Sequence, residues 1–111
     1  MPMYLFQGKF SPEAFKALID RPHDRTEAAR KVIEAAGGKL HQYFYAFGEY
    51  DVVVLMEYPD NAACAAASMA VAAGGAMSAG KTTVLMTSAE AQKAMAKANA
   101  AAKAYAPPTR G

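Results

Sequence analysis

The chain is 111 residues long, and its twelve basic and ten acidic residues give a formal net charge of +2. This length is that of one domain, and the near balance of charges, with no block of one sign, excludes the electrostatic pattern of a protein that binds nucleic acid or an anionic membrane surface. The single cysteine excludes an intrachain disulfide, and no apolar run approaches the roughly 20 residues that span a bilayer.

The N-terminal part of the chain predicts a strand followed by a kinked helical segment. Residues 3–10 are rich in β-favouring side chains. Ser11-Pro12-Glu13 supplies a cap, a proline suited to the first helical position and an acidic side chain for the positive end of the helix dipole. Pro22 breaks this helix, and the pair Asp24 and Glu27 has the spacing of a capping box that restarts it.

The restarted helix has an apolar stripe that runs from Ala28 to Ala36, and we expect Arg25 and the other charged side chains to lie mostly off it. Gly37-Gly38 ends the helix, because glycine tolerates the left-handed conformation that a helix C-terminus often needs. Strands are then predicted at residues 39–47 and 50–58, with a tight turn between them.

The second half of the chain predicts a helix, a strand and a final helix. Asp60 or Asn61 caps a helix over residues 61–73, and a glycine pair stops it. A strand follows near residues 81–86, and Thr87 with Glu90 forms a capping box that opens a terminal helix.

The predicted order is β-α-β-β-α-β with an additional C-terminal helix, which is the ferredoxin-like pattern of an α+β domain. We expect this domain to cover residues 1–104 and residues 105–111 to form a flexible tail. No secretory signal is visible in the sequence, so we expect a cytoplasmic protein.

Apolar side chains fall on both faces of the predicted sheet. In the strand at 39–47, alternation places Leu40 and Phe44 on one face and Tyr43 and Tyr45 on the other. Two helices can cover only one face of a four-stranded sheet, which would leave a large apolar patch. We therefore expect a second copy to cover that face in a two-fold dimer, or a larger assembly built from it. The alternative is that the C-terminal helix folds over it.

The turn region Gly48, Tyr50 and Asp51 resembles the sequence for which the GYD domain family is named. The resemblance covers roughly residues 2–90 and includes Ser11-Pro12-Glu13, the segment 25–31, Gly37-Gly38, the aromatic second strand and the apolar third strand that ends near Pro59-Asp60. It implies a ferredoxin-like fold of the dimeric α+β barrel kind. It implies no particular reaction, because similar barrels include enzymes, haem proteins and ligand sensors.

The residues His41, Tyr43 and Tyr45 recur with period two, so they are predicted to share one face of a strand. On a barrel wall, His41 is a candidate acid or base and the tyrosines are candidates for ligand binding. The alternative is that they pack in the dimer interface. His23 is expected to be exposed near the kink, and no spacing typical of a metal site is present, so we predict neither a metal nor a cofactor.

A second candidate group lies in the turn. Glu49 and Tyr50 are candidates for ligand binding, and Asp51 is a further candidate acid or base. The structural interpretation of the same residues is that Gly48 permits the turn, Asp51 accepts hydrogen bonds from backbone N–H groups, and Tyr50 packs at the end of the sheet.

Three further patterns in the sequence have structural explanations. Cys64 lies in the first turn of a predicted helix, which favours a thiolate, although a lone buried cysteine usually behaves as a small apolar residue. The methionines Met69, Met77, Met86 and Met95 are expected to fill gaps in an alanine-rich core. Residues 75–82 match the letters of a phosphate-binding loop, but a helix precedes them and a strand follows, so we interpret the match as accidental.

Together these patterns predict a small homo-oligomeric protein that binds a small organic molecule. The first alternative is a cofactor-independent monooxygenase or isomerase acting on an aromatic or quinone-like substrate. The second is a structural or regulatory module that binds another protein.

Overall fold

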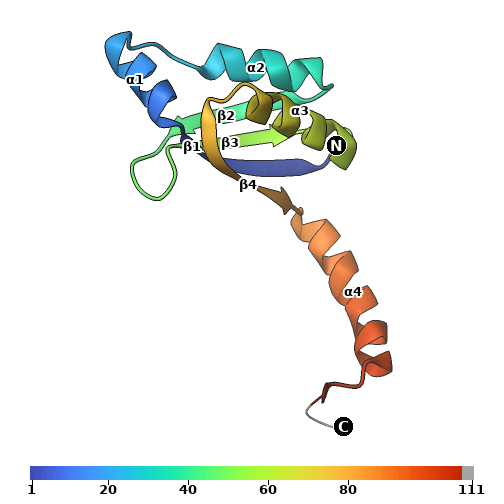
Figure 1. Ribbon diagram of the computed structural model, residues 1–111. Coiled ribbons are helices and arrows are strands. Elements are labelled where there is room, and N and C mark those ends of the chain that lie inside the picture. The colour runs from blue at the N-terminus through green and yellow to red at the C-terminus, as the bar shows by residue number, and fades with distance from the viewer. Residues whose placement is uncertain (109–111) are drawn as a thin grey trace.

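The computed structural model describes residues 1–108 and shows four strands and four helices (Figure 1). Their bounds are β1 Met3–Phe10, α1 Pro12–Asp20, α2 Thr26–Ala35, β2 Lys39–Tyr45, β3 Val52–Glu57, α3 Asn61–Ala73, β4 Met77–Leu85 and α4 Ser88–Ala104. The strands form one antiparallel sheet in the order β2-β3-β1-β4. This arrangement confirms the predicted α+β, ferredoxin-like fold with an additional C-terminal helix. Residues 109–111 of the expected tail lie outside the described residues.

Most of the predicted helix starts are confirmed by their hydrogen bonds. Ser11 Oγ accepts from the Ala14 N–H at 3.2 Å, and Asp60 Oδ1 accepts from the Ala63 N–H at 2.9 Å. The Thr87 and Glu90 capping box is present at the start of α4. The capping box predicted for α2 is wrong, because Arg25 occupies the cap position without a side-chain cap.

The connection between β2 and β3 is longer than the predicted tight turn. β2 ends at Tyr45 and β3 begins at Val52, and the Ala46 N–H donates to the Asp51 carbonyl at 2.7 Å across the base of the loop. Among the described residues, the glycines with positive φ are Gly37 and Gly75. The left-handed conformation expected at the end of α2 is therefore present at Gly37, and the loop does not use one at Gly48.

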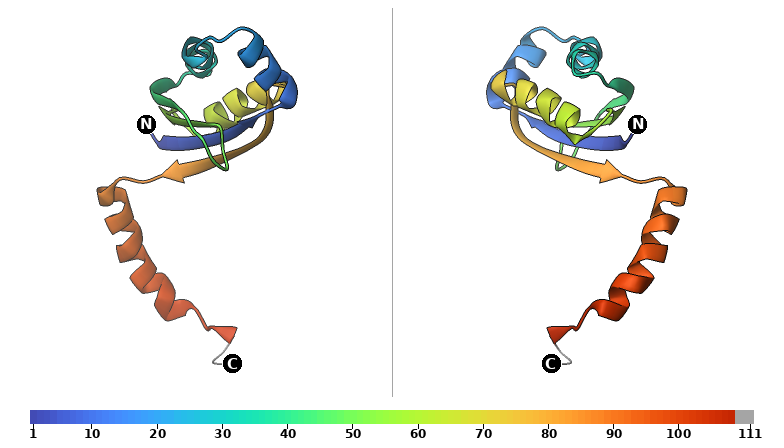
Figure 2. Two further views of the ribbon diagram at one scale, coloured as in Figure 1. Left: turned by 90° about the vertical axis from the view of Figure 1, so that its left-hand side faces the viewer. Right: turned by 90° about the vertical axis from the view of Figure 1, so that its right-hand side faces the viewer.

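The core lies between one face of the sheet and the helices α2 and α3 (Figure 2). Tyr4, Val52 and Tyr58 are completely buried there. The ring of Tyr58 lies against the backbone of Gly38, where an added Cβ would be 2.5 Å from the ring and 2.6 Å from the Glu57 carbonyl oxygen. Gly38 is therefore required for close packing rather than for backbone conformation.

Within residues 1–108, no helix covers the opposite face of the sheet (Figures 1 and 2). The alternative, in which the C-terminal helix folds over this face, is wrong, because α4 extends away from the sheet and buries no residue. Because α4 projects from the domain, the radius of gyration of the chain is 18.1 Å, whereas a compact chain of this length has a radius of gyration of roughly 13 Å.

No helix within residues 1–108 has both the length and the apolar character to cross a bilayer.

Candidate functional site

A cavity of about 130 Å³ lies between the sheet and the helices α2 and α3. The sheet contributes Phe6, Val52 and Val54 to its walls. The helices contribute apolar side chains on their inner faces: Ala29, Val32 and Ile33 from α2, and Ala67 and Val71 from α3. The amphipathic pattern of α2 turns these side chains inward, so the walls of the cavity are mainly apolar.

Four polar side chains line this cavity, namely Arg25, Tyr43, Tyr58 and Ser68. The Ser68 hydroxyl donates to the Cys64 carbonyl at 3.0 Å, and the Tyr58 hydroxyl donates to the thioether of Met56 at 3.4 Å. Burial raises the pKa of Tyr58 to about 12. The protons of these two hydroxyls are therefore already directed at protein acceptors.

Tyr43 lies on the same face of the sheet as the buried Val54, with which it is paired in the β2–β3 register. Burial raises the pKa of Tyr43 well above its ordinary value, neighbouring Tyr45 raises it further, and the positive charge of Arg25 opposes both effects. The Tyr43 phenol is consequently neutral near pH 7 and can donate a hydrogen bond.

Tyr45 lies next to Tyr43, with ring centroids 5.3 Å apart in an edge-to-face arrangement. Its hydroxyl accepts from the backbone N–H of Arg25 at 2.8 Å and donates to Asp24 Oδ1 at 3.3 Å. Hydrogen bonds from the side chain and backbone of Thr26 lower the pKa of Asp24, so that this acceptor is charged near pH 7. Tyr45 thus fixes the start of α2 and does not line the cavity.

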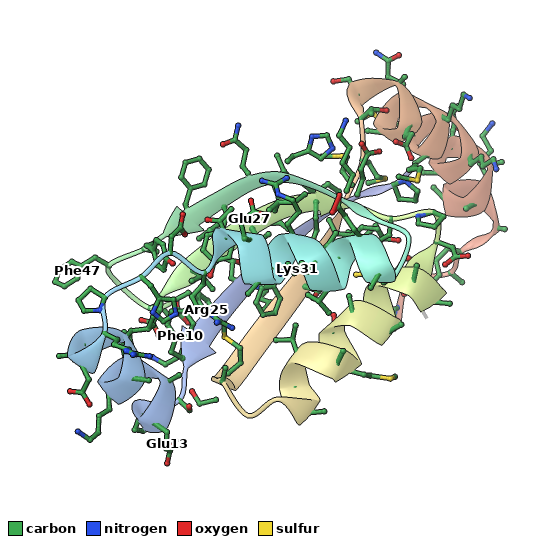
Figure 3. The ribbon with its side chains drawn as sticks, turned by 90° about the horizontal axis from the view of Figure 1, so that it is seen from above. Phe10, Glu13, Arg25, Glu27, Lys31 and Phe47 are labelled. Carbon is green, nitrogen blue, oxygen red and sulfur yellow. The ribbon has the colours of Figure 1, made fainter. Side chains whose placement is uncertain are left out.

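The Arg25 side chain lines the cavity, and Figure 3 shows it near Phe10, which is also a lining residue.

His41 is separated from the two tyrosines by an irregularity in β2. The register between β2 and β3 shifts between Leu40 and Gln42, which breaks the alternation of side chains at this point. His41 Nε2 lies 2.7 Å from Glu57 Oε1 and does not line the cavity. The prediction that His41, Tyr43 and Tyr45 share one face is therefore wrong.

Asp51 serves the backbone, as its structural interpretation predicted. Its Oδ2 accepts from the Phe10 N–H at 2.9 Å, and its own N–H donates to the Gly8 carbonyl at 2.8 Å. With Tyr45 it borders a second, more open hollow beside α1. Glu49 is exposed and Tyr50 is half-buried, and neither lines the main cavity. Of the predicted ligand-binding residues, only Tyr43 lines it within the described part of the chain.

The other candidates do not form sites. Burial raises the pKa of the Cys64 thiol, which opposes the thiolate that its place in α3 suggested. The structure supports the interpretation that the phosphate-loop match is accidental. Residues 77–85 form the strand β4, and Gly80 packs closely against the Phe6 ring, since an added Cβ there would lie 2.8 Å from it. Residues 1–108 contain no cluster of three His, Cys, Asp or Glu side chains that could hold a metal ion.

The methionines differ from expectation. Met77 lines the cavity, whereas Met69, Met86 and Met95 are 70%, 63% and 67% exposed, so these three do not fill gaps in the core.

Sequence reasoning missed Arg25 as a site residue. We expected its side chain to lie off the apolar stripe of α2, yet it lines the cavity with Ala29 and Val32. The spacing contained a signal, because positions 25, 29 and 32 are separated by four and three residues and so face the same side of a helix. Arg25 stands at the start of the apolar stripe of α2, and this position could have indicated that its side chain lies at the cavity.

The family model described as "GYD domain" matches residues 4–95 of the chain. The fold is similar to that of MtbAldR, with a TM-score of 0.53 and 15% identity over 78% of this chain and 52% of that one, so that this chain spans about half the length of MtbAldR. It is also similar to protein Atu4242 from Agrobacterium tumefaciens, with a TM-score of 0.50 and 11% identity over 79% and 94% of the two chains. No curated protein sequence matches. At these identities the likenesses show the fold alone.

Proposed function

We propose that this chain, which belongs to the GYD domain family, binds a small organic molecule in the cavity between the sheet and helices α2 and α3. The observation that carries the proposal is the cavity itself, with a volume of about 130 Å³ and mainly apolar walls. A dry cavity of about 150 Å³ accepts benzene in another protein. The size therefore suits a molecule with one ring or a branched chain of similar bulk.

Packing supports this proposal. Protein interiors are close-packed, so apolar side chains that line an unfilled space lack van der Waals partners on one side. A ligand in the cavity would supply those contacts.

We also propose that a second copy of the chain covers the open face of the sheet. This face carries Leu5, Val53 and Leu55, which are half-buried, and Phe44, which is 56% exposed. A two-fold, sheet-to-sheet dimer would bury this apolar surface without using the helical layer that encloses the cavity.

The placement of the candidate acids and bases favours binding over the enzymatic alternative. His41 and Asp51 were the proposed acid or base of a cofactor-independent reaction, and neither lines the cavity. His41 pairs with Glu57, and Asp51 accepts from a backbone N–H group. We expect His41→Ala to leave ligand binding unchanged.

A cavity-filling substitution tests the proposal. Ala29 lines the cavity, whereas Ala35 lies on the same helix, is exposed and does not line it. Calorimetric titration with benzyl alcohol should show saturable binding to the unmodified protein and to Ala35→Leu, and at least a tenfold loss in Ala29→Leu. Binding that is absent from the unmodified protein, or equal in the two variants, would contradict this site.

A further inference from the structure

We infer that the ligand is a small monocarboxylate whose acidic group is bound by Arg25 and whose apolar body fills the cavity; this inference rests on the proposed function. Among the described residues that line the cavity, Arg25 is the only charged side chain. A single cation beside mainly apolar walls favours a ligand that has one complementary anionic group and an apolar body.

The ionic partners of the two arginines near the start of α2 differ. Arg30 Nε lies 3.1 Å from Glu27 Oε1 and so has an acidic neighbour. Within residues 1–108, Arg25 forms no ion pair. A half-buried guanidinium without a carboxylate partner retains its parallel N–H donors for a ligand, and their spacing matches a carboxylate in two parallel hydrogen bonds.

Tyr43 provides a second donor to the same group. Its phenol lines the cavity, and its ring lies 5.3 Å from that of Tyr45, whose hydroxyl contacts the backbone N–H of Arg25. Ser68 and Tyr58 do not compete for this role, because their hydroxyl protons are directed at the Cys64 carbonyl and the Met56 thioether. The anionic group is therefore placed at the Arg25 and Tyr43 end of the cavity.

The charge and the volume favour a carboxylate over a phosphate ester. A phosphate monoester carries nearly two negative charges near pH 7, whereas the described lining contains one cation. The volume of about 130 Å³ also leaves little room for a phosphate group beside an apolar body. Benzoate combines one ring with one carboxylate, and benzyl alcohol is a neutral probe of nearly the same shape.

The experiment compares benzoate with benzyl alcohol by calorimetric titration in four proteins. These are the unmodified chain, Arg25→Met, Arg25→Lys and the control Lys31→Met, which removes one positive charge from an exposed position of the same helix. Arg25→Met should fold, because Tyr45 holds the backbone N–H of residue 25 and not its side chain. Thermal unfolding of each variant checks this.

We expect benzoate to bind the unmodified chain at least tenfold more tightly than benzyl alcohol, which is the scale of one charge-assisted hydrogen bond. Arg25→Met should abolish this preference without weakening benzyl alcohol binding, Arg25→Lys should keep part of it, and Lys31→Met should keep all of it. Equal binding of the two probes to the unmodified chain, or a preference that survives in Arg25→Met, would overturn the inference while the cavity proposal stands. Failure of both probes to bind would overturn both.

Discussion

The hydroxyl of Tyr45, at the end of β2, accepts a hydrogen bond from the backbone N–H of Arg25 at 2.8 Å. This contact joins residues 20 positions apart and places the start of α2 over the cavity. Because Tyr45 contacts the arginine through its backbone and does not line the cavity, it acts as a positioning residue for the proposed anion site.

Tyr45→Phe should therefore weaken benzoate binding several-fold and leave benzyl alcohol binding nearly unchanged. The substitution removes two exposed hydrogen bonds, one with the Arg25 N–H and one with Asp24, so it should lower the free energy of unfolding by no more than about 1 kcal/mol. Tyr50→Phe is the matched control, since Tyr50 does not line the cavity. A purely structural role for Tyr45 would instead reduce the binding of both probes equally.

Two glycines should respond oppositely to substitution. Gly38→Ala would bring a Cβ to 2.5 Å from the Tyr58 ring and 2.6 Å from a backbone oxygen, so we expect a loss of about 1–3 kcal/mol in the free energy of unfolding. An added Cβ at Gly48 meets no atom within 4 Å, and this glycine does not have a positive φ. Gly48→Ala should be neutral or stabilising by about 0.4–1 kcal/mol. Urea unfolding measures the free energy of unfolding of each variant, and equal destabilisation by the two substitutions would contradict the structure.

Alkaline pH should weaken the fold through Tyr58. Burial raises its pKa to about 12, against about 10 in an unfolded chain. Below pH 10 both states keep the proton, and between pH 10 and 12 the unfolded state loses it first, so the free energy of unfolding falls as the pH rises. Tyr58→Phe removes the contribution of Tyr58 to this loss of stability. The contributions of Tyr4 and Tyr43, whose pKa values are also raised, remain in the variant.

Urea unfolding of both proteins at pH 8 and pH 11 checks this expectation. The unmodified chain should lose more stability between the two values than Tyr58→Phe does. An identical loss in the two proteins would show that the Tyr58 phenol ionises equally well in the folded state.

The open sheet face should determine the oligomeric state. Leu55→Asp places a carboxylate at the centre of this face, on the strand β3, and should convert a dimer to a monomer because an unpaired charge would be buried in the interface. Ile19 is an exposed apolar residue of α1 in the helical layer, so Ile19→Asp should remain dimeric. Light scattering after size-exclusion chromatography gives the masses. A monomeric unmodified chain would contradict the second-copy proposal.

The order of elements could be predicted because each strand and helix carries its own local signals. Ser11, Asp60 and Thr87 cap the helices at which they were expected, and the corresponding hydrogen bonds form. Such capping depends on a few neighbouring residues, so no knowledge of tertiary contacts is needed. The apolar strand predicted at residues 50–58 was equally clear from its composition, and it forms over residues 52–57.

The candidate site was less predictable because it depends on register and on contacts between distant segments. The irregularity between Leu40 and Gln42 leaves no signal in a simple alternation of side chains, and it separates His41 from Tyr43. The cavity also depends on how α3 packs against α2, and α3 is so rich in alanine that its inward face is not distinguished by hydrophobicity. Arg25 was identified as a lining residue only when α2 was placed over the sheet.

A benzoate titration followed by methyl NMR shows whether a small organic molecule occupies the cavity between the sheet and helices α2 and α3. Val54 and Val71 line the cavity, while Val53 and Leu55 lie on the open face of the sheet. We expect saturable shifts of the Val54 and Val71 methyl signals, with those of Val53 and Leu55 nearly unchanged. Shifts confined to Val53 and Leu55, or no shifts at all, would rule out binding in this cavity.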